Sequence, residues 1–204
     1  AAKQTSTSVS IDEFDLAKGT QAALRARGIE SLFEIQARTY KPIREGQDVI
    51  GRARTGQGKT LAFCLPILEQ LLQKSAKAPF GARGALPRAL LLSPTRELAK
   101  QIVDEFVSVA PKTMRIECIY GGVPLSGNQR VLSDGVDVII GTPGRVKDVL
   151  DKGWLRLQNV RHFCLDEADR MLDMGFSEEI NAIFACVTET TDAIKKKNEQ
   201  EIDS

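Results

Sequence analysis

The chain has 204 residues, of which 42% are hydrophobic and 27% charged, and its 28 lysines and arginines nearly balance 27 aspartates and glutamates. This composition is typical of a globular domain and excludes a disordered, collagen-like or disulfide-scaffold protein. Because the formal net charge is only +1, a site for a polyanion must be built from locally placed groups rather than from bulk positive charge.

No apolar run is long enough to span a membrane, and the polar first residues lack the apolar core of a signal peptide. We therefore expect a soluble protein without a membrane partner.

The cysteines are widely spaced in apolar surroundings and the chain has one histidine, a pattern that argues against zinc and favours reduced, buried thiols. These cysteines are Cys64, Cys118, Cys164 and Cys186.

Short apolar runs alternate with helical patterns along the chain. The sequence predicts strands at 48–51, 88–93, 115–120, 136–140 and 162–165, and helices at 59–73, 97–109, 145–152 and 177–186. This alternation indicates βαβ units around a mainly parallel sheet. We expect a flexible segment at 1–10, a single α/β domain at 11–187 with a surface loop at 74–88, and a polar tail at 188–204.

The segment between the first predicted strand and helix has the pattern of a phosphate-binding loop, with alanine in place of its first glycine. Small residues there let backbone N–H groups converge on phosphate oxygens at a helix N-terminus. Lys59 would reach the β- and γ-phosphates, and the Thr60 hydroxyl would bind Mg²⁺. The predicted nucleotide-binding residues of this loop are Ala53, Arg54, Thr55, Gly56, Gln57, Gly58, Lys59 and Thr60.

An acidic sequence, Asp-Glu-Ala-Asp at 166–169, follows the last predicted strand. Asp166 is placed to bind Mg²⁺ through water, and Glu167 is placed to orient or deprotonate an attacking water. The three carboxylates would repel one another, so we expect a cation to balance them. Asp166, Glu167 and Lys59 are the predicted catalytic residues.

These two motifs together resemble the DEAD-box RNA helicase family, and further motifs recur in the family's order between about Phe14 and Cys186. They are Gly28-Ile29 with Ile35-Gln36, Pro94-Thr-Arg-Glu-Leu-Ala99, Gly121-Gly122 and Thr142-Pro-Gly-Arg145. The resemblance implies a RecA-like, doubly wound α/β fold with helices on both faces of a mainly parallel sheet, and it implies ATP or ADP and Mg²⁺ as ligands.

The resemblance also assigns roles to single residues. It implies that Gln36 reads the adenine edge, which suits an amide that both donates and accepts hydrogen bonds, that Phe14 stacks on the base, and that Asp169 couples the motif to the rest of the protein. RNA would be bound through hydroxyls, backbone N–H groups and two arginines, independently of base sequence. The implied RNA-binding residues are Pro94, Thr95, Arg96, Glu97, Gly121, Gly122, Thr142, Pro143, Gly144 and Arg145.

The sequence departs from the family pattern in two places. Leu32-Phe33 replaces the usual Pro-Thr, so the family's threonine contact to the phosphate-binding loop cannot form. Leu-Phe here, like the run at 51–63, resembles the nucleolar RNA helicase subgroup (RNA helicase two or Gu type) and predicts ribosome biogenesis in the nucleolus, with the cytoplasm as the other location. After Asp169 no Ser-Ala-Thr follows, and we expect the second RecA-like domain with its arginine fingers, which the resemblance implies, to be missing from this chain.

We therefore expect a monomeric fragment of a longer helicase that binds adenine nucleotide weakly and hardly separates strands alone. The leading interpretation is the N-terminal domain of an ATP-dependent RNA helicase, an RNA-stimulated ATPase. Two alternatives are a P-loop motor that acts on DNA, and an RNA clamp or scaffold that uses the nucleotide as a structural ligand. The Gln36 motif argues against the first, and the intact Lys59 and Glu167 argue against the second.

Overall fold

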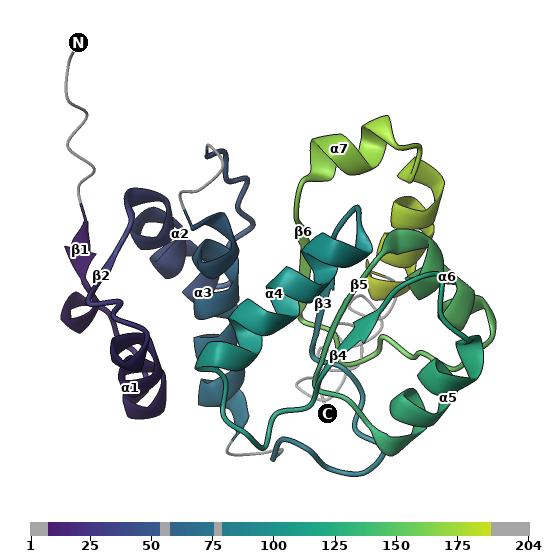
Figure 1. The fold of residues 1–204 in the computed structure, drawn as a ribbon, viewed down its shortest axis with the longest axis horizontal. Coiled ribbons are helices and arrows are strands. Elements are labelled where there is room, and N and C mark those ends of the chain that lie inside the picture. The colour runs from purple at the N-terminus through teal and green to yellow at the C-terminus, as the bar shows by residue number, and fades with distance from the viewer. Residues whose placement is uncertain (1–7, 54–57, 76–78, 189–204) are drawn as a thin grey trace, which may run out of the picture. The chain divides into compact units, whose positions relative to one another are not determined.

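The computed structural model describes residues 8–53, 58–75 and 79–188. Contacts within the chain divide it into two compact units, the first made of Ala1–Pro79 and Asp104–Lys112 and the second of Phe80–Val103 and Thr113–Ser204. Figure 1 labels the elements of both units. The boundaries predicted at residues 10 and 187 remain a prediction.

The first unit is mainly helical. Its described elements are β1 (Val9–Ser10), the 3₁₀ helix Ile11–Glu13, α1 (Lys18–Ala26), β2 (Ser31–Leu32), α2 (Glu34–Arg44) and α3 (Lys59–Lys74). β1 and β2 pair antiparallel. The sequence predicted only α3 among them, since β1 and β2 have two residues each and α2 carries Pro42 in its interior.

Helix α3 holds the first unit together because its buried polar side chains bind neighbouring backbone. Glu69 accepts a hydrogen bond from the Ala17 N–H at 2.9 Å, just before α1. Gln70 donates to the carbonyls of Ile43 and Arg44 at 3.1 and 2.9 Å, which satisfies the C-terminal end of α2. Both side chains are buried, so their hydrogen bonds fix how α1 and α2 join α3.

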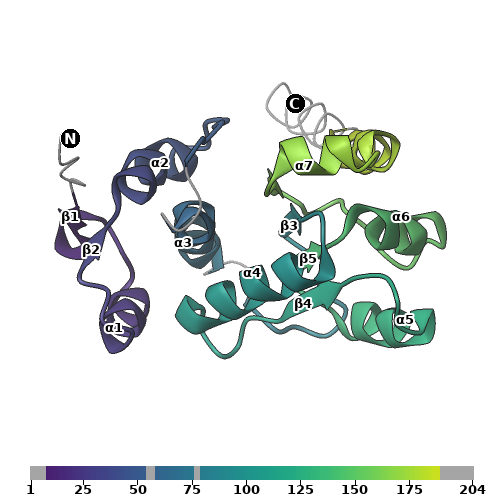
Figure 2. The same ribbon diagram turned by 45° about the horizontal axis from the view of Figure 1, so that its top comes forward.

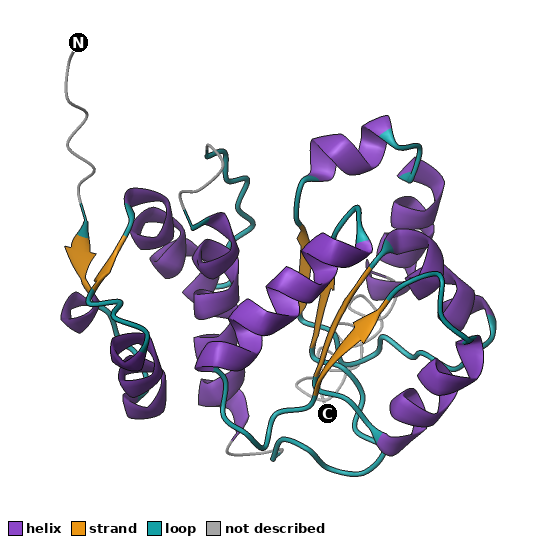
Figure 3. Cartoon of the chain, in the orientation of Figure 1, coloured by secondary structure: helices purple, strands orange, loops and turns teal. Residues whose placement is uncertain are grey.

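The second unit is built on a sheet whose four described strands all run parallel. They are β3 (Ala89–Leu92), β4 (Ile116–Ile119), β5 (Val138–Gly141) and β6 (His162–Leu165), in the order β4-β5-β3-β6. The described helices of this part are α4 (Arg96–Val109, whose last residues belong to the first unit), α5 (Leu125–Asp134), α6 (Pro143–Asp151), α7 (Ala168–Asp173) and a helix at 177–188. Figure 3 shows the strands in orange.

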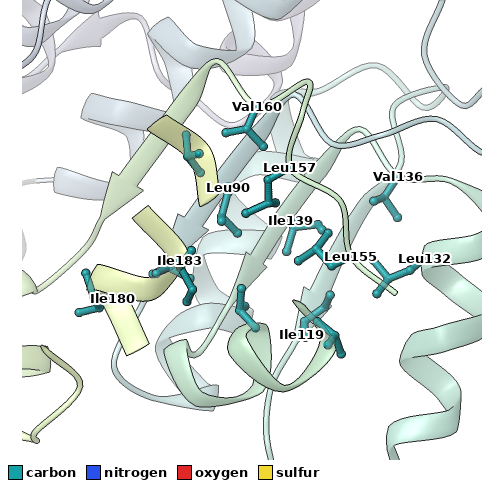
Figure 4. Close-up of a cluster of buried hydrophobic side chains, with 14 of the residues drawn as sticks. Leu90, Ile119, Leu132, Val136, Ile139, Leu155, Leu157, Val160, Ile180 and Ile183 are labelled. Carbon is teal, nitrogen blue, oxygen red and sulfur yellow. The ribbon is translucent and has the colours of Figure 1, made fainter. Parts of the chain in front are cut away.

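Helices cover both faces of this sheet. On one face, Leu90, Ile119 and Ile139 pack against apolar side chains from α5, α6, α7 and the helix at 177–188 (Figure 4). Successive side chains of a strand point to opposite faces, so Tyr120 points away from this core, and α4 side chains lie over its ring. In Figure 2, α4 and α6 lie on opposite sides of the strands. The predicted α/β class with a parallel sheet is confirmed.

The segment before β3 is tied to the sheet by a buried carboxylate. Asp137 is fully buried and its Oδ2 accepts hydrogen bonds from the backbone N–H groups of Gly81 and Arg115, each at 2.9 Å. Its Oδ1 lies 3.6 Å from the Arg88 guanidinium, which in turn lies 4.9 Å from the centre of the Phe80 ring. The described part of the predicted loop, 79–88, is therefore anchored and not merely a surface connection.

One predicted strand is wrong: residues 48–51 form neither strand nor helix. Ile50 is 101% exposed and Val49 is 39% exposed. A strand needs backbone partners on a neighbouring strand, and within the described residues 48–51 pair with none. The apolar Val-Ile pair was therefore an insufficient sign of a strand.

The cysteine prediction holds in part. None of the four cysteines, all of them described, forms a disulfide, and Cys64 is buried. Cys118 and Cys164 are half-buried, and Cys186 is exposed on the outer side of the helix at 177–188, which corrects the expectation of four buried thiols. No helix among the described residues is both long and apolar enough to cross a membrane.

Candidate nucleotide and nucleic-acid site

Gln36 is buried between the start of α2 and the start of α3. Its side-chain oxygen accepts a hydrogen bond from the Phe33 N–H at 2.8 Å, and its Nε2 donates to the Gly58 carbonyl at 3.0 Å. These two bonds fix the orientation of the amide, and among the described residues its second N–H and second lone pair make no further bond. The predicted adenine-reading residue is thus attached directly to the last glycine of the phosphate-binding loop.

Gly58 meets two requirements that only glycine satisfies. It precedes α3 with φ +67°, in the left-handed region, and a Cβ there would lie 2.2 Å from Gln36 Nε2 and 3.2 Å from Phe33 Cδ2. The missing side chain is what lets Gln36 approach. Lys59 and Thr60 then begin α3, at the helix end whose N–H groups favour anions.

Of the other predicted residues of the phosphate-binding loop, only Ala53 lies within the described residues. Ala53 is half-buried in a segment without regular structure, whereas Arg54, Thr55, Gly56 and Gln57 lie outside the described residues. Thr39, one turn after Gln36, donates its hydroxyl to the Ala62 carbonyl at 2.7 Å. This buried bond joins α2 to the first turn of α3 and keeps Gln36 close to Gly58.

Phe14 lies near the same face of α2. Its ring packs edge-on against Tyr40, with the centroids 5.0 Å apart and the planes at 74°, and Tyr40 stands one helical turn after Gln36. The Tyr40 hydroxyl donates to the Asp15 carbonyl at 2.6 Å. Burial, reinforced by the charge of Glu69, raises the pKa of Tyr40 far above its ordinary value. Phe14 therefore has a packing role, beside which the predicted base stacking remains a prediction.

The parallel register brings the remaining motifs to one edge of the second unit, where the strands end, which we call the carboxyl edge. Leu92 pairs with both Gly141 and Leu165, and Ile119 pairs with Gly141. Each predicted motif begins within two residues of one of these strand ends, and strands of one direction end at one edge. In sheet order, this edge carries Gly121-Gly122 after β4, Thr142–Arg145 after β5, Pro94–Glu97 after β3 and Asp166–Asp169 after β6.

The acidic motif is held in a bent backbone. Asp166 donates its backbone N–H to the Leu92 carbonyl at 2.9 Å, which extends the ladder between β3 and β6. Glu167 has φ 53° and ψ 49°, and it is the only non-glycine residue with positive φ in the described ranges. For such a residue this conformation costs about 1–2 kcal/mol, and strain of this kind is typical of functional sites.

Arg170 neutralises part of the acidic motif. Its guanidinium pairs with the Glu167 carboxylate at 3.0 Å, while its backbone N–H donates to the Asp169 carboxylate at 2.9 Å. The mutual repulsion expected of these carboxylates is therefore relieved in part by a neighbouring side chain. Arg170 was not among the predicted site residues, although its position three residues after Glu167 on a helix could have indicated the pair.

The two threonines of this edge precede helices. Thr95 caps α4 by accepting the Leu98 N–H at 3.3 Å, so its hydroxyl proton is available to an anion. Thr142 precedes Pro143, the first residue of α6, and its side chain makes no capping hydrogen bond. Glu97 lies in the first turn of α4, where the backbone N–H groups and Arg96 hold the pKa of its carboxyl below the usual value.

Arg145 is held by hydrogen bonds within the protein, and its RNA-binding role remains a prediction. Its side chain is only 10% exposed. It donates to the Val123 carbonyl and to Asn128 Oδ1, both at 3.0 Å. These bonds fix the segment that follows Gly121-Gly122, a supporting role that the spacing of the motif could not reveal.

The predicted catalytic and metal-binding residues belong to different units: Lys59 and Thr60 to the first, and Asp166 and Glu167 to the second. Among the described residues, no group of three or more His, Cys, Asp or Glu side chains is arranged to hold a metal.

Comparison with known proteins identifies the family. The chain is 49% identical over 161 residues to DEAD-box ATP-dependent RNA helicase 9, mitochondrial, of Arabidopsis thaliana, covering 79% of this chain and 26% of that protein. It is 42% identical over 183 residues to Nucleolar RNA helicase 2 of Rattus norvegicus, covering 88% of this chain and 22% of that protein. The chain thus spans about a quarter of the length of these relatives.

A crystal structure of a DEAD box protein from the hyperthermophile Methanococcus jannaschii has the same fold. It matches 89% of this chain, and 47% of its own chain is covered, with a TM-score of 0.76 and 33% sequence identity. Residues 33–200 match the DEAD/DEAH box helicase family, a range that includes every motif of the carboxyl edge. The chain belongs to the DEAD/DEAH box helicase family.

Proposed function

We propose that this chain is the N-terminal, ATP-binding RecA-like domain of an ATP-dependent RNA helicase that couples ATP hydrolysis to RNA unwinding or to remodelling of protein–RNA complexes. The observation that carries the proposal is the shared carboxyl edge. There, the parallel register gathers four separate motifs of hydroxyls, backbone N–H groups, arginines and carboxylates.

The residues suit Mg²⁺ and an adenine nucleotide. Gly58 lacks the Cβ that would collide with the Gln36 amide, and among the described residues Gln36 has one N–H and one lone pair left for a base. The Thr60 hydroxyl and the Asp166 carboxylate are hard oxygen ligands of the type that Mg²⁺ prefers, with waters and phosphate oxygens completing its shell.

The bound nucleotide would supply the phosphoryl group whose hydrolysis drives the protein. Lys59 would neutralise charge on its terminal phosphates, and Thr60 and Asp166 would hold the metal. Glu167 would orient the attacking water and accept its proton. Its ion pair with Arg170 holds that carboxylate in place, so Arg170 would act as a positioning residue.

RNA would contact the carboxyl edge through the sugar–phosphate backbone. Thr95 can donate its hydroxyl proton, and α4 and α6 begin at this edge, where helix N–H groups favour phosphate. Such contacts do not read bases, so binding would be independent of sequence. The second RecA-like domain, a part of the longer relatives in this interpretation, would complete the RNA site.

Calorimetric titration with Mg·ADP and Mg·GDP tests the nucleotide site. We expect ADP to bind at least tenfold more tightly, about 1.4 kcal/mol, and Gln36→Ala to abolish the preference. Gln70→Ala is the matched control, because it also removes a buried carboxamide that caps backbone in the same unit. Equal binding of ADP and GDP by the wild-type chain would refute the adenine-reading site.

A second experiment tests RNA-dependent ATP hydrolysis and the role of Glu167. It measures how RNA and DNA stimulate ATP turnover in a longer protein that contains this chain. We expect RNA to stimulate turnover more than DNA of the same sequence, and Glu167→Gln to abolish turnover. Stronger stimulation by DNA would favour the DNA motor. Turnover unchanged by Glu167→Gln would favour the clamp or scaffold.

We also propose a role in ribosome biogenesis in the nucleolus, supported by the similarity to nucleolar RNA helicases. Relatives named as mitochondrial and chloroplastic are 49% and 48% identical over shorter stretches, so organelles are the competing locations. Fluorescence imaging of the longer protein, tagged at its C-terminus, in its native cells distinguishes these locations.

A further inference from the structure

Tyr120 stands at the carboxyl edge between β4 and Gly121-Gly122 with two cations against its ring. The Arg96 guanidinium carbon lies 5.9 Å from the ring centre, and the Lys100 ammonium nitrogen lies 5.0 Å from it. Both distances are within the range of a cation–π attraction. The two cations are four residues apart on α4, so they lie on one face of the helix, about 6 Å apart along its axis.

Both cations are open to solvent, whereas Tyr120 is half-buried. Arg96 uses its Nε for Glu97 at 3.0 Å, which leaves its two terminal nitrogens free of ion pairs among the described residues. None of the ion pairs found among the described residues involves Lys100. A surface lysine that is held over a ring and forms no ion pair within 4 Å among the described residues is available to an external anion.

We propose that Tyr120 positions Arg96 and Lys100 as a two-cation clamp for neighbouring phosphates of an RNA strand, and that Lys100 is thereby a further RNA contact. The inference rests on the proposed function. The clamp lies next to Gly121-Gly122 and one turn along α4 from Thr95, so it extends the carboxyl edge along the helix. The ring restricts where the two flexible side chains go, which reduces the entropy lost when they bind phosphate.

The test is the salt dependence of binding between the 204-residue chain and fluorescein-labelled oligouridylate, measured by anisotropy. Each phosphate contact to a single strand contributes about 0.7 to the slope of log affinity against log salt concentration. We expect Lys100→Gln to lower the slope by about that amount and affinity severalfold at low salt. Tyr120→Leu is expected to have a similar effect, and Tyr120→Phe, which keeps the ring, is expected to behave like wild type.

Lys152→Gln is the matched control. Lys152 also lies over an aromatic ring, that of Trp154 at 5.6 Å, but it follows the C-terminal end of α6 rather than a strand's carboxyl end. We expect its slope to equal that of wild type. Urea unfolding of each variant separates a lost contact from a lost fold, and Lys100→Gln, an exposed change, keeps the test valid if Tyr120→Leu unfolds.

The outcomes separate this inference from the function on which it rests. If the wild-type chain binds oligouridylate and Arg96→Gln weakens binding, but Lys100→Gln leaves the slope unchanged, the clamp is refuted and the RNA-binding edge stands. Equal losses in Tyr120→Phe and Tyr120→Leu would also refute the positioning role of the ring. If neither this chain nor a longer protein that contains it shows salt-dependent binding, both the clamp and the proposed RNA function fail.

Discussion

Gly58 shows how closely two residues far apart in sequence can depend on each other. Its left-handed backbone alone disfavours any other residue, and its carbonyl is bonded by Gln36. A methyl group there would collide with the Gln36 amide at 2.2 Å. Stability and the geometry of the candidate adenine site are therefore coupled at this one position.

We predict that Gly58→Ala lowers the free energy of unfolding by about 2–4 kcal/mol, from backbone strain plus overpacking. Gly28→Ala is the control, because Gly28 also has a positive φ of +73° but a Cβ there would meet no atom within 4 Å. It should cost only the strain, about 1–2 kcal/mol. Urea denaturation measures both, and equal losses in the two variants would contradict the close contact.

Glu117 on the edge strand β4 should make stability depend on pH. Burial raises the pKa of its carboxyl, and Arg115 opposes this shift only in part. Because the pKa of Glu117 is higher in the folded state than in the unfolded state, protonation of its carboxyl favours folding. This contribution to stability is fully present below the unfolded pKa of about 4.3 and is lost as the pH rises through the folded pKa. The wild-type chain therefore carries a cost at neutral pH.

We predict that Glu117→Gln raises the urea midpoint relative to wild type at pH 7 and that the gain shrinks towards pH 3.5, which is about one unit below the ordinary pKa of a glutamate. Glu34→Gln provides the comparison, since Glu34 is an exposed glutamate at the start of α2. A gain for Glu117→Gln that is the same at both pH values would show that burial of the charge is not its cause.

Helix α2 begins with an incomplete cap. Phe33 occupies the N-cap position, and Gln36 accepts its N–H, but a phenylalanine side chain has no atom that can accept an N–H in return. The replacement of the family's threonine therefore leaves a helix N–H without its usual side-chain partner. The departure from the family pattern should therefore lower the stability of the first turn of α2.

We predict that Phe33→Thr stabilises the chain by about 1 kcal/mol relative to Phe33→Val, because threonine and valine share a shape and only threonine can cap. Comparing these two variants removes the loss of the half-exposed ring from the result. Thermal and urea unfolding both provide the measurement. No difference between threonine and valine would mean that the Gln36 half of the cap suffices.

Asp137 joins the segment 79–88 to the starts of the strands. We predict that Asp137→Ala destabilises the chain by about 3–5 kcal/mol, because it leaves Arg88, whose side chain is 15% exposed, without its carboxylate. Asp137→Asn, which keeps an oxygen for Gly81 and Arg115, should lose less. Trypsin should cleave after Arg83 fastest in Asp137→Ala, more slowly in Asp137→Asn and slowest in the wild-type chain. Equal cleavage rates would contradict the anchoring.

The elements that could be predicted from sequence are those whose pattern is local. Strands β3 and β5 are buried on a parallel sheet and appear as continuous apolar runs, β6 is half-buried with three apolar residues after His162, and α3 and α4 have clear periodicity. Helix α2 was missed because its interior proline and its buried Gln36, Thr39 and Tyr40 obscure the apolar stripe. The wrongly predicted strand at 48–51 had the residues of a strand but not the neighbour that a strand requires.

The candidate site was likewise predicted only where its residues follow from local sequence patterns. The carboxyl edge followed from strand positions, since parallel strands end together. By contrast, the bond between Gln36 and Gly58, the burial of Arg145 and the ring under Lys100 depend on side chains that meet only after folding. The sequence contains these residues but not their contacts.

At the scale of the whole molecule, the two compact units should differ in their response to mutation. We predict that Gly58→Ala accelerates amide hydrogen exchange in α2 and α3 more than in the sheet, and that Asp137→Ala accelerates exchange in β3 and β5 more than in α3. Mass spectrometry of exchanged peptides measures this. Uniform acceleration in both variants would mean that the chain opens as one cooperative unit.

The left-handed backbone of Glu167 has a consequence for protein engineering. Glycine or asparagine adopts that conformation more easily than glutamate does, so a library selected only for heat resistance has no reason to keep the carboxylate. We expect such a selection to enrich variants at this position that are more stable and that, if Glu167 has the proposed catalytic role, no longer hydrolyse ATP. Libraries screened for ATP turnover should retain glutamate and seek their stability elsewhere in the chain.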